Sequence, residues 1–133
     1  MAATFEDKSR ALLEAPNFCH VATLRKDGTP HVVPVWVDLE GDEVLLNTAE
    51  GRAWPTNARR DPRVTLTVQN LENPYEYVSI RGHVAEDTHD GADDHIDRLA
   101  KKYLDKNSYP FRQEGEQRVT FKVTPDEVRH WGA

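Results

Sequence analysis

The chain has 133 residues, of which 38% are hydrophobic and 30% are charged, and its formal net charge at pH 7 is −6. This length and apolar content are sufficient for one domain with one hydrophobic core, and they exclude two full domains, collagen and extended disorder. The net negative charge disfavours a nucleic-acid-binding surface, because phosphates attract a field of the opposite sign.

The N-terminal quarter of the chain predicts a helix followed by the first strand of a hairpin. Residues 5–15 place apolar side chains at helical spacing, and Pro16 ends the pattern. From residue 18 to residue 25 the period changes to two, which is typical of a strand. Asp27 and Gly28 then supply the positive-φ pair of a tight hairpin turn, so the next strand pairs with this one.

The second strand, over residues 31–39, is apolar on both of its faces. One face carries Val33, Val35, Val37 and Leu39, and the other carries Val32, Pro34 and Trp36. A strand of this kind must be covered on both sides. We therefore expect one face to lie in the core and the other against a partner chain or a flat ligand. A third strand follows over residues 43–48.

The middle of the chain predicts a short helix and two further strands. Pro55 has no amide proton and fits the first turn of a helix, so a helix of about two turns begins near Trp54. Alternating apolar residues then indicate strands over residues 64–68 and 75–86. Gly82 marks a bulge within the second of these strands.

The last third predicts a helix and one more strand. Acidic residues from Asp90 onward, apolar residues at helical spacing and lysines up to Lys106 delimit the helix. Residues 119–124 alternate as a strand, and residues 125–133 are expected to form a tail. Six antiparallel strands in one small domain close most simply into a barrel, because closure removes exposed edges. We therefore predict one mainly β domain over residues 1–133, with peripheral helices outside the barrel.

Several well-known chemical motifs are absent from the sequence. No G-x-G, G-x-S-x-G, H-E-x-x-H or C-x-x-C pattern occurs. The single cysteine, Cys19, excludes an intramolecular disulfide and a zinc site built from several thiolates. The acidic segment with His83, His89 and His95 reads as a solvated helix start, so no metal site is expected. No apolar run approaches the roughly 20 residues that cross a bilayer, and we expect a cytoplasmic protein.

Basic residues are concentrated between Gly51 and Arg63, in a chain that is otherwise acidic. Here the end of a strand leads into a helix, whose first amide protons and dipole attract anions. Thr48 and Thr56 offer hydroxyl donors there, and Arg52 offers a bidentate guanidinium. The segment therefore predicts a phosphate site, with a solvated helix whose arginines balance nearby acids as the alternative.

Four stretches of the sequence carry, in order, a resemblance to a known family. They are residues 22–36, Gly51-Arg52 with residues 57–64, Asn73-Pro74-Tyr75, and residues 81–84. The chain resembles the split-barrel flavin and deazaflavin reductases, the pyridoxamine-phosphate-oxidase-like proteins, over most of its length. Within that superfamily it is similar to the coenzyme F420-dependent oxidoreductases of actinobacteria.

The resemblance implies a six-stranded split barrel, a homodimer, and a cofactor groove between the two protomers. The cofactor ring is then expected along the hairpin strand, at Val33, Pro34, Val35 and Trp36. The phosphate is expected at Thr48, Arg52, Asn57 and Arg60. The partner protomer is expected to contribute Tyr75, Tyr77 and Trp131. The N-terminal helix (residues 1–16) and the tail (residues 125–133) would pack at the dimer or cofactor groove.

One position departs from the family pattern. Many relatives have a lysine two residues after Arg52, where this chain has Trp54. Either Arg52, Arg60 and the helix amides hold the phosphate, or Trp54 stacks on a ring. Loss of cofactor binding is the third alternative.

The activity that the resemblance implies is hydride transfer from the reduced deazaflavin coenzyme F420 to a planar, electron-poor small molecule. The protein would supply orientation, so no catalytic side chain is assigned. An FMN-dependent oxidoreductase and a non-catalytic ligand-binding module on the same fold are the alternatives.

Overall fold

The computed structural model describes residues 2–132 and consists mainly of β-strands, with three helices at the periphery. The helices are α1 (Asp7–Glu14), α2 (Ala53–Arg60) and α3 (Ala92–Leu104). The strands are β1 (Cys19–Leu24), β2 (Pro30–Val35), β3 (Val37–Glu40), β4 (Glu43–Ala49), β5 (Arg63–Gln69), β6 (Tyr77–Thr88) and β7 (Arg118–Trp131). The expected fold class is confirmed.

All seven strands form one antiparallel sheet in the order β2-β1-β5-β6-β7-β4-β3. Its two edge strands, β2 and β3, follow one another in the chain and are separated only by Trp36. A sheet whose opposite edges are joined by one residue must curl until those edges approach each other. The result is a barrel that is split between β2 and β3, because these two edge strands do not pair with each other.

The seventh strand arises because the chain changes its pairing partner at Trp36. Residues 31–39 were expected to form a single strand, but β2 pairs with β1 and β3 pairs with β4. In register, Cys19 lies opposite Val35 on one side of the break, and Val37 lies opposite Leu46 on the other. The expected count of six strands therefore becomes seven, without a change in architecture.

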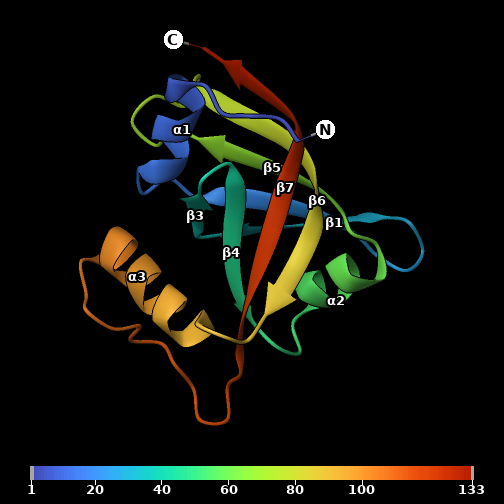
Figure 1. Cartoon of the computed structure of the whole chain (residues 1–133), viewed down its shortest axis with the longest axis vertical. Coiled ribbons are helices and arrows are strands. Elements are labelled where there is room, and N and C mark those ends of the chain that lie inside the picture. The colour runs from blue at the N-terminus through green and yellow to red at the C-terminus, as the bar shows by residue number, and fades with distance from the viewer. Residues whose placement is uncertain (1, 133) are drawn as a thin grey trace.

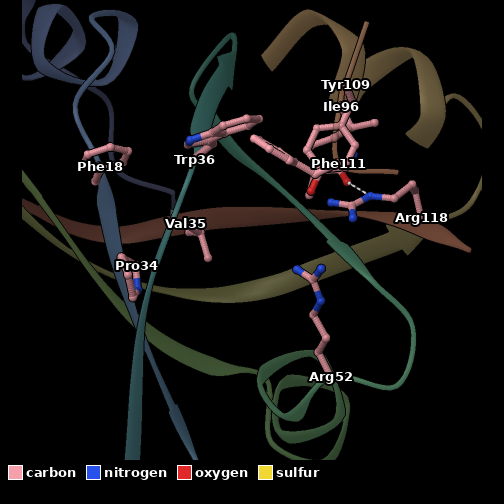
Figure 2. Close-up of a pocket in the computed structure, with 10 residues that line it drawn as sticks. Phe18, Pro34, Val35, Trp36, Arg52, Ile96, Tyr109, Phe111 and Arg118 are labelled. Carbon is pink, nitrogen blue, oxygen red and sulfur yellow. Dashed lines mark hydrogen bonds between the residues drawn. The ribbon is translucent and has the colours of Figure 1, made fainter. Parts of the chain in front are cut away.

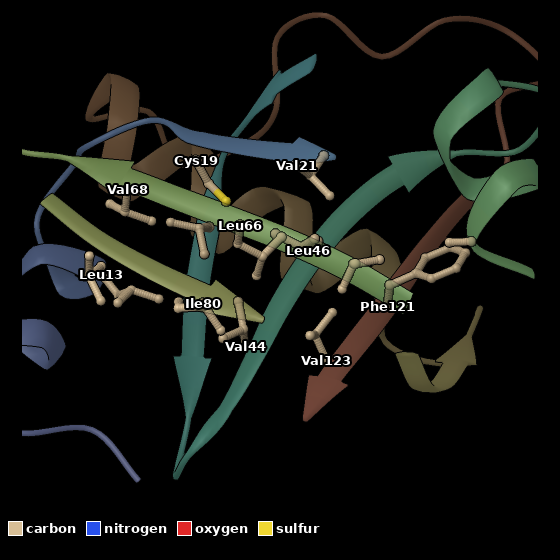
Figure 3. Packing of buried hydrophobic residues seen from close by; sticks show 14 of the residues in the cluster. Leu13, Cys19, Val21, Val44, Leu46, Leu66, Val68, Ile80, Phe121 and Val123 are labelled. Atoms are coloured by element: carbon tan, nitrogen blue, oxygen red, sulfur yellow. The ribbon is translucent and has the colours of Figure 1, made fainter. Parts of the chain in front are cut away.

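The barrel interior is filled by aliphatic side chains and one aromatic ring. Leu46, Leu66, Ile80 and Phe121 are completely buried and project from four different strands, and Leu13 of α1 joins them at one end of the barrel (Figure 3). Burial of large apolar side chains of this kind contributes about 1.5–3 kcal/mol each, so this cluster supplies the main stabilisation of the fold.

The helices cover different parts of the sheet. In Figure 1, α1 lies at the end of the barrel near the C-terminus, whereas α2 and α3 lie toward the opposite end. The helix α3 buries His95, Ile96 and Leu99 and contacts β4 and β7. None of the described helices has the length and apolar character needed to span a bilayer.

The last strand is longer than the sequence pattern indicated. β7 continues through Pro125 to Trp131, which pairs with Tyr77 of β6, so residues 125–131 are part of the sheet and do not form a separate tail. The bulge expected at Gly82 is confirmed, because the β6–β7 register shifts between Arg81 and Gly82. A shift of this kind lets the long strand bend, so that it can belong to both halves of the barrel.

We predict that Gly82→Ala destabilises the fold by about 1–3 kcal/mol. A Cβ atom at this position would lie 2.5 Å from the backbone oxygen of Thr124, so the two strands would have to separate. Urea unfolding would measure the loss, with Ser79→Ala in the same strand as the control. An equal, small effect of both substitutions would show that the bulge tolerates a side chain.

Candidate functional site

A pocket of about 360 Å³ opens at the split of the barrel. Its apolar wall comes from three separate parts of the chain: Phe18 before β1, the run Pro34, Val35 and Trp36 at the end of β2, and Ile96, Tyr109 and Phe111 from α3 and the segment that follows it (Figure 2). The sequence-predicted Pro34, Val35 and Trp36 therefore lie together along one wall of the pocket. Val33 does not line the pocket and, like Val35, packs against the barrel core.

The indole of Trp36 is held in place by stacked aromatic rings. It lies parallel to the ring of Tyr103, with 5.1 Å between the centroids and 6° between the planes. The ring of Tyr103 also stacks on the ring of Phe18. The hydroxyl of Tyr103 donates to the carbonyl of Asn17 at 2.6 Å and accepts from the amide of Val37 at 3.1 Å. Burial raises the pKa of Tyr103, so the hydroxyl keeps its proton. The aromatic wall is thus fixed to the backbone.

Two arginines form the polar end of the pocket. Arg52 caps the N-terminus of α2 without a side-chain cap bond, and its side chain is 54% exposed. The side chain of Arg118, at the start of β7, is only 2% exposed. Figure 2 shows their guanidinium groups pointing toward one another across the pocket. The amide protons of the first turn of α2, Pro55 excepted, have no partner within the helix, and no side chain caps this end of α2.

A buried chain of polar side chains fixes Arg118 from behind. Arg118 Nε donates to Asn47 Oδ1 at 2.9 Å, so the Asn47 amide nitrogen must point the other way, where it donates to the Ala92 carbonyl at 2.9 Å and faces His95 Nδ1 at 3.2 Å. His95 Nδ1 therefore acts as the acceptor, and its proton resides on Nε2, 3.6 Å from Asp38. The orientation of Arg118 is consequently determined by the packing of α3 on the sheet.

The other arginines of the basic segment are already engaged. Arg59 makes a two-point ion pair with Glu50, at 2.6 and 2.8 Å, and also contacts Asp87. Arg60 donates to the carbonyl of Leu24 at 2.9 Å, and Arg63 pairs with Asp61 at 2.7 Å. Among the arginines of this segment, Arg52 is the one that lines the pocket. It is therefore the cation of this segment that a ligand in the pocket can reach.

The structure separates the remaining phosphate-site candidates from the pocket. Thr48 projects into the barrel, completely buried, while its neighbour Asn47 lines the pocket from the opposite face of β4. Thr56 donates to the carbonyl of Arg52 at 3.0 Å within α2. Asn57 is buried, donates to Thr23 at 3.2 Å and accepts from Arg60 at 2.9 Å, so these residues attach α2 to β1.

The expected stacking role of Trp54 is not supported by its position. Its side chain is 4% exposed, belongs to the barrel core and packs on Phe121 with 4.9 Å between the ring centroids. The amphipathic pattern of α2 explains this, because Trp54 and Ala58 are one helical turn apart and share the buried face. Trp54 therefore cannot stack on a ligand ring in this arrangement.

The aromatic residues assigned to a partner protomer lie away from the pocket within one chain. Trp131 pairs with Tyr77 at the far end of β6 and β7, and Tyr75 lies in the preceding turn. Tyr75 is 84% exposed and Trp131 is 67% exposed. None of these residues lines the pocket of its own chain.

Sequence reasoning missed several residues of the pocket. Arg118 was not singled out, although it directly precedes the apolar alternation that begins β7. Tyr109 and Phe111 lie in an irregular segment, and their only signal was an aromatic pair around a proline. Asn47 was assigned to the correct strand, but its neighbour Thr48 was preferred because of its hydroxyl group.

Comparison with known proteins gives a consistent family assignment. The family model described as pyridoxamine 5'-phosphate oxidase matches residues 5–132. No curated protein sequence matches the chain. A solved structure named F420 reductase is 28% identical, covers 94% of this chain and 98% of its own, and superposes with a TM-score of 0.83.

Two further solved structures share the fold. A conserved hypothetical protein from Mycobacterium tuberculosis is 21% identical, with a TM-score of 0.74, and the match covers 98% of this chain and 86% of that one. General Stress Protein 26 from Bacillus anthracis is 17% identical, with a TM-score of 0.70 and coverages of 94% and 92%. At these identities the likeness concerns the fold alone.

We predict that the Glu50–Arg59 pair makes a pH-dependent contribution to stability. Hydrogen bonds from Arg59 and then His89 lower the pKa of Glu50 from 4.5 to about 2. Because the folded pKa lies below the unfolded value, the stabilisation is present above about pH 4.5 and is lost as the pH falls toward about 2. Glu50→Gln should cost about 0.5–1 kcal/mol at neutral pH, since the pair is partly exposed to solvent.

Urea unfolding at about pH 7, 5 and 3 would measure this contribution. The difference between wild type and Glu50→Gln should shrink as the pH falls, whereas Glu72→Gln, at an exposed position, should match wild type throughout. A difference that is constant over this pH range would contradict the assignment to Glu50.

Proposed function

The chain belongs to the pyridoxamine 5'-phosphate oxidase family, and we propose that it is an oxidoreductase that holds the deazaflavin coenzyme F420 in the pocket between Trp36 and Arg52. The observation that carries this proposal is the juxtaposition of a fixed apolar wall with Arg52, the arginine of the basic segment that lines the pocket. The F420 reductase among the similar structures supports the choice of cofactor.

The residues present fit a flat ring that carries a phosphate. Pro34, Val35 and Trp36 offer a wall on which a tricyclic ring can lie, and Arg52, Arg118 and the uncapped end of α2 offer positive charge at one end of it. The lysine that many relatives have at the position of Trp54 is therefore not required. Arg118 provides a second guanidinium from a different strand.

When bound, the reduced cofactor would supply a hydride to a planar, electron-poor acceptor. The protein's own residues have three tasks in that reaction. Arg52 fixes the phosphate and thereby the position of the ring, Trp36 sets the plane of the ring, and Tyr109 and Phe111 exclude water from one side of the pocket. No side chain of the pocket is required as a nucleophile.

We also propose that the working form is a homodimer, in which the partner protomer completes the groove. Trp131, Tyr75 and Val32 are 67%, 84% and 58% exposed, and large apolar side chains at such exposures favour a protein partner. Tyr77 and Trp131 share one end of the β6–β7 ribbon. In the proposed dimer, both residues of one protomer can therefore reach the pocket of the other protomer together.

FMN is the second candidate cofactor, and one observation favours it. Two guanidinium groups converge on the same end of the pocket, and paired arginines suit the terminal phosphate of FMN. A non-catalytic carrier of either cofactor would use the same contacts, and only turnover separates it from an enzyme.

Separate titrations with F420 and FMN, followed by tryptophan fluorescence, test the proposal. Trp36 lines the pocket and Trp54 is in the core, so quenching should come from Trp36 and, in the proposed dimer, from Trp131 of the partner protomer. Quenching should therefore decrease in Trp36→Phe, and the part that remains should come from Trp131. F420 binding with hydride transfer to quinones, enones or nitroaromatic compounds would support the enzyme. Binding without turnover would indicate a carrier, FMN preference would indicate the flavin branch, and no binding of either would refute the proposal.

We predict that Arg52→Ala weakens F420 binding by about 1–3 kcal/mol, because it removes a charge-assisted contact to the phosphate. Arg98→Ala is the matched control, since Arg98 is exposed on α3 and removes the same charge outside the pocket. Isothermal titration would compare the two variants with wild type. An unchanged dissociation constant for Arg52→Ala would remove Arg52 from the site.

A further inference from the structure

Glu116 stands between the two arginines of the pocket. Its Oε1 atom lies 2.9 Å from Arg118 Nη1 and 3.8 Å from Arg52 Nη2. A turn in which the Glu116 amide donates to the carbonyl of Gln113, with Gly115 at φ 76°, holds it there. The oxygen therefore contacts both cations at the end of the pocket where an anionic group of a ligand would bind.

The burial of this carboxylate is not explained by stability alone. The side chain of Glu116 is 8% exposed, and its Oε2 atom is buried without a hydrogen-bond partner among the described residues. A buried acceptor without a partner is destabilising, and buried ion pairs are often no more stable than apolar replacements. Arg118 is also held independently by Asn47 and by the ring of Tyr109, 5.1 Å from its guanidinium carbon.

The carboxylate changes the charge that a ligand meets. Two guanidinium groups and one carboxylate leave a single net positive charge at this end of the pocket. An anion placed between the arginines is attracted by both, but it is repelled by Glu116 at short range, where the low dielectric strengthens the repulsion. The repulsion grows with the charge of the anion, so it is larger for a dianion than for a monoanion.

We propose that Glu116 is a specificity-determining residue, which makes the pocket select a singly charged phosphodiester over a doubly charged phosphomonoester. This inference rests on the proposed function, in which the pocket holds a cofactor that carries a phosphate. The two candidate cofactors differ in this respect. The phosphate of F420 is a diester with one charge, whereas the terminal phosphate of FMN is a monoester whose second ionisation has a pKa of about 6. Glu116 thus favours F420.

Glu116→Gln tests the inference, because glutamine keeps the shape and the oxygen that accepts from Arg118 while it removes the charge. We expect about tenfold tighter binding of FMN at about pH 8, and less than about threefold change for F420 and for riboflavin, which has no phosphate. The gain for FMN should diminish at about 1 M salt. An unchanged ratio of FMN to F420 affinity would overturn the proposal.

Glu114→Gln is the matched control, since Glu114 lies on the same segment, is exposed and carries the same charge. It should change none of the three affinities by more than about twofold. An equal gain for FMN in this variant would mean that general charge, and not Glu116, is responsible. Glu116→Asp keeps the charge and should keep the wild-type preference, so tighter FMN binding in this variant would also overturn the proposal.

Inorganic phosphate separates this inference from the proposed function. Its binding at about pH 8 can be followed by NMR through the Nε–H signals of Arg52 and Arg118. Glu116→Gln should bind phosphate at least about fivefold more tightly than wild type or Glu114→Gln, whether or not either cofactor binds. Equal phosphate affinities would overturn the role of Glu116, whereas failure of F420 and FMN to bind would overturn the cofactor assignment alone.

Discussion

The structure depends on one covalent constraint: the two edge strands of the sheet are a single stretch of chain with a break at Trp36. Because β2 pairs with β1 and β3 pairs with β4, a sheet of seven strands has to curl back on itself. The seam left between the two strands is the split of the barrel. Trp36 is positioned at this seam by backbone geometry, and the stacked ring of Tyr103 fixes its plane. The pocket is therefore a consequence of how the barrel closes.

The distribution of ion pairs decides which charges are available to a ligand. Arg59, Arg60 and Arg63 each have a partner nearby in the fold, and their role is to attach α2 and the adjoining strands. Arg52, at the uncapped start of α2, lines the pocket with a half-exposed side chain. Arg118 is buried, and the cost of burying a guanidinium is offset by its fixed hydrogen bonds to Asn47 and Glu116. The arginines that line the pocket are thus different from those that attach α2 to the sheet.

Much of the architecture could be predicted because it depends on local patterns. Alternation of apolar residues identified the strands, the Asp27-Gly28 pair identified the hairpin, and Gly82 identified the bulge. The end of β2 could be predicted to need a cover on both sides because it is apolar on both faces, and its residues line the pocket. The break at Trp36 could not be predicted, since it reflects a change of partner strand that leaves no mark on the local pattern.

The sequence by itself therefore determined the class of fold, the apolar wall at Pro34 to Trp36 and the presence of an accessible cation in the basic segment, because each follows from neighbouring residues. Which side chains meet at the polar end of the pocket depended on the tertiary structure. Asn47 and Arg118 are far apart in the chain and come together only when β4 pairs with β7. Trp54 faces the core because α2 docks by its apolar side. Contacts of this kind are set by strand pairing and helix packing, which act over long sequence separations.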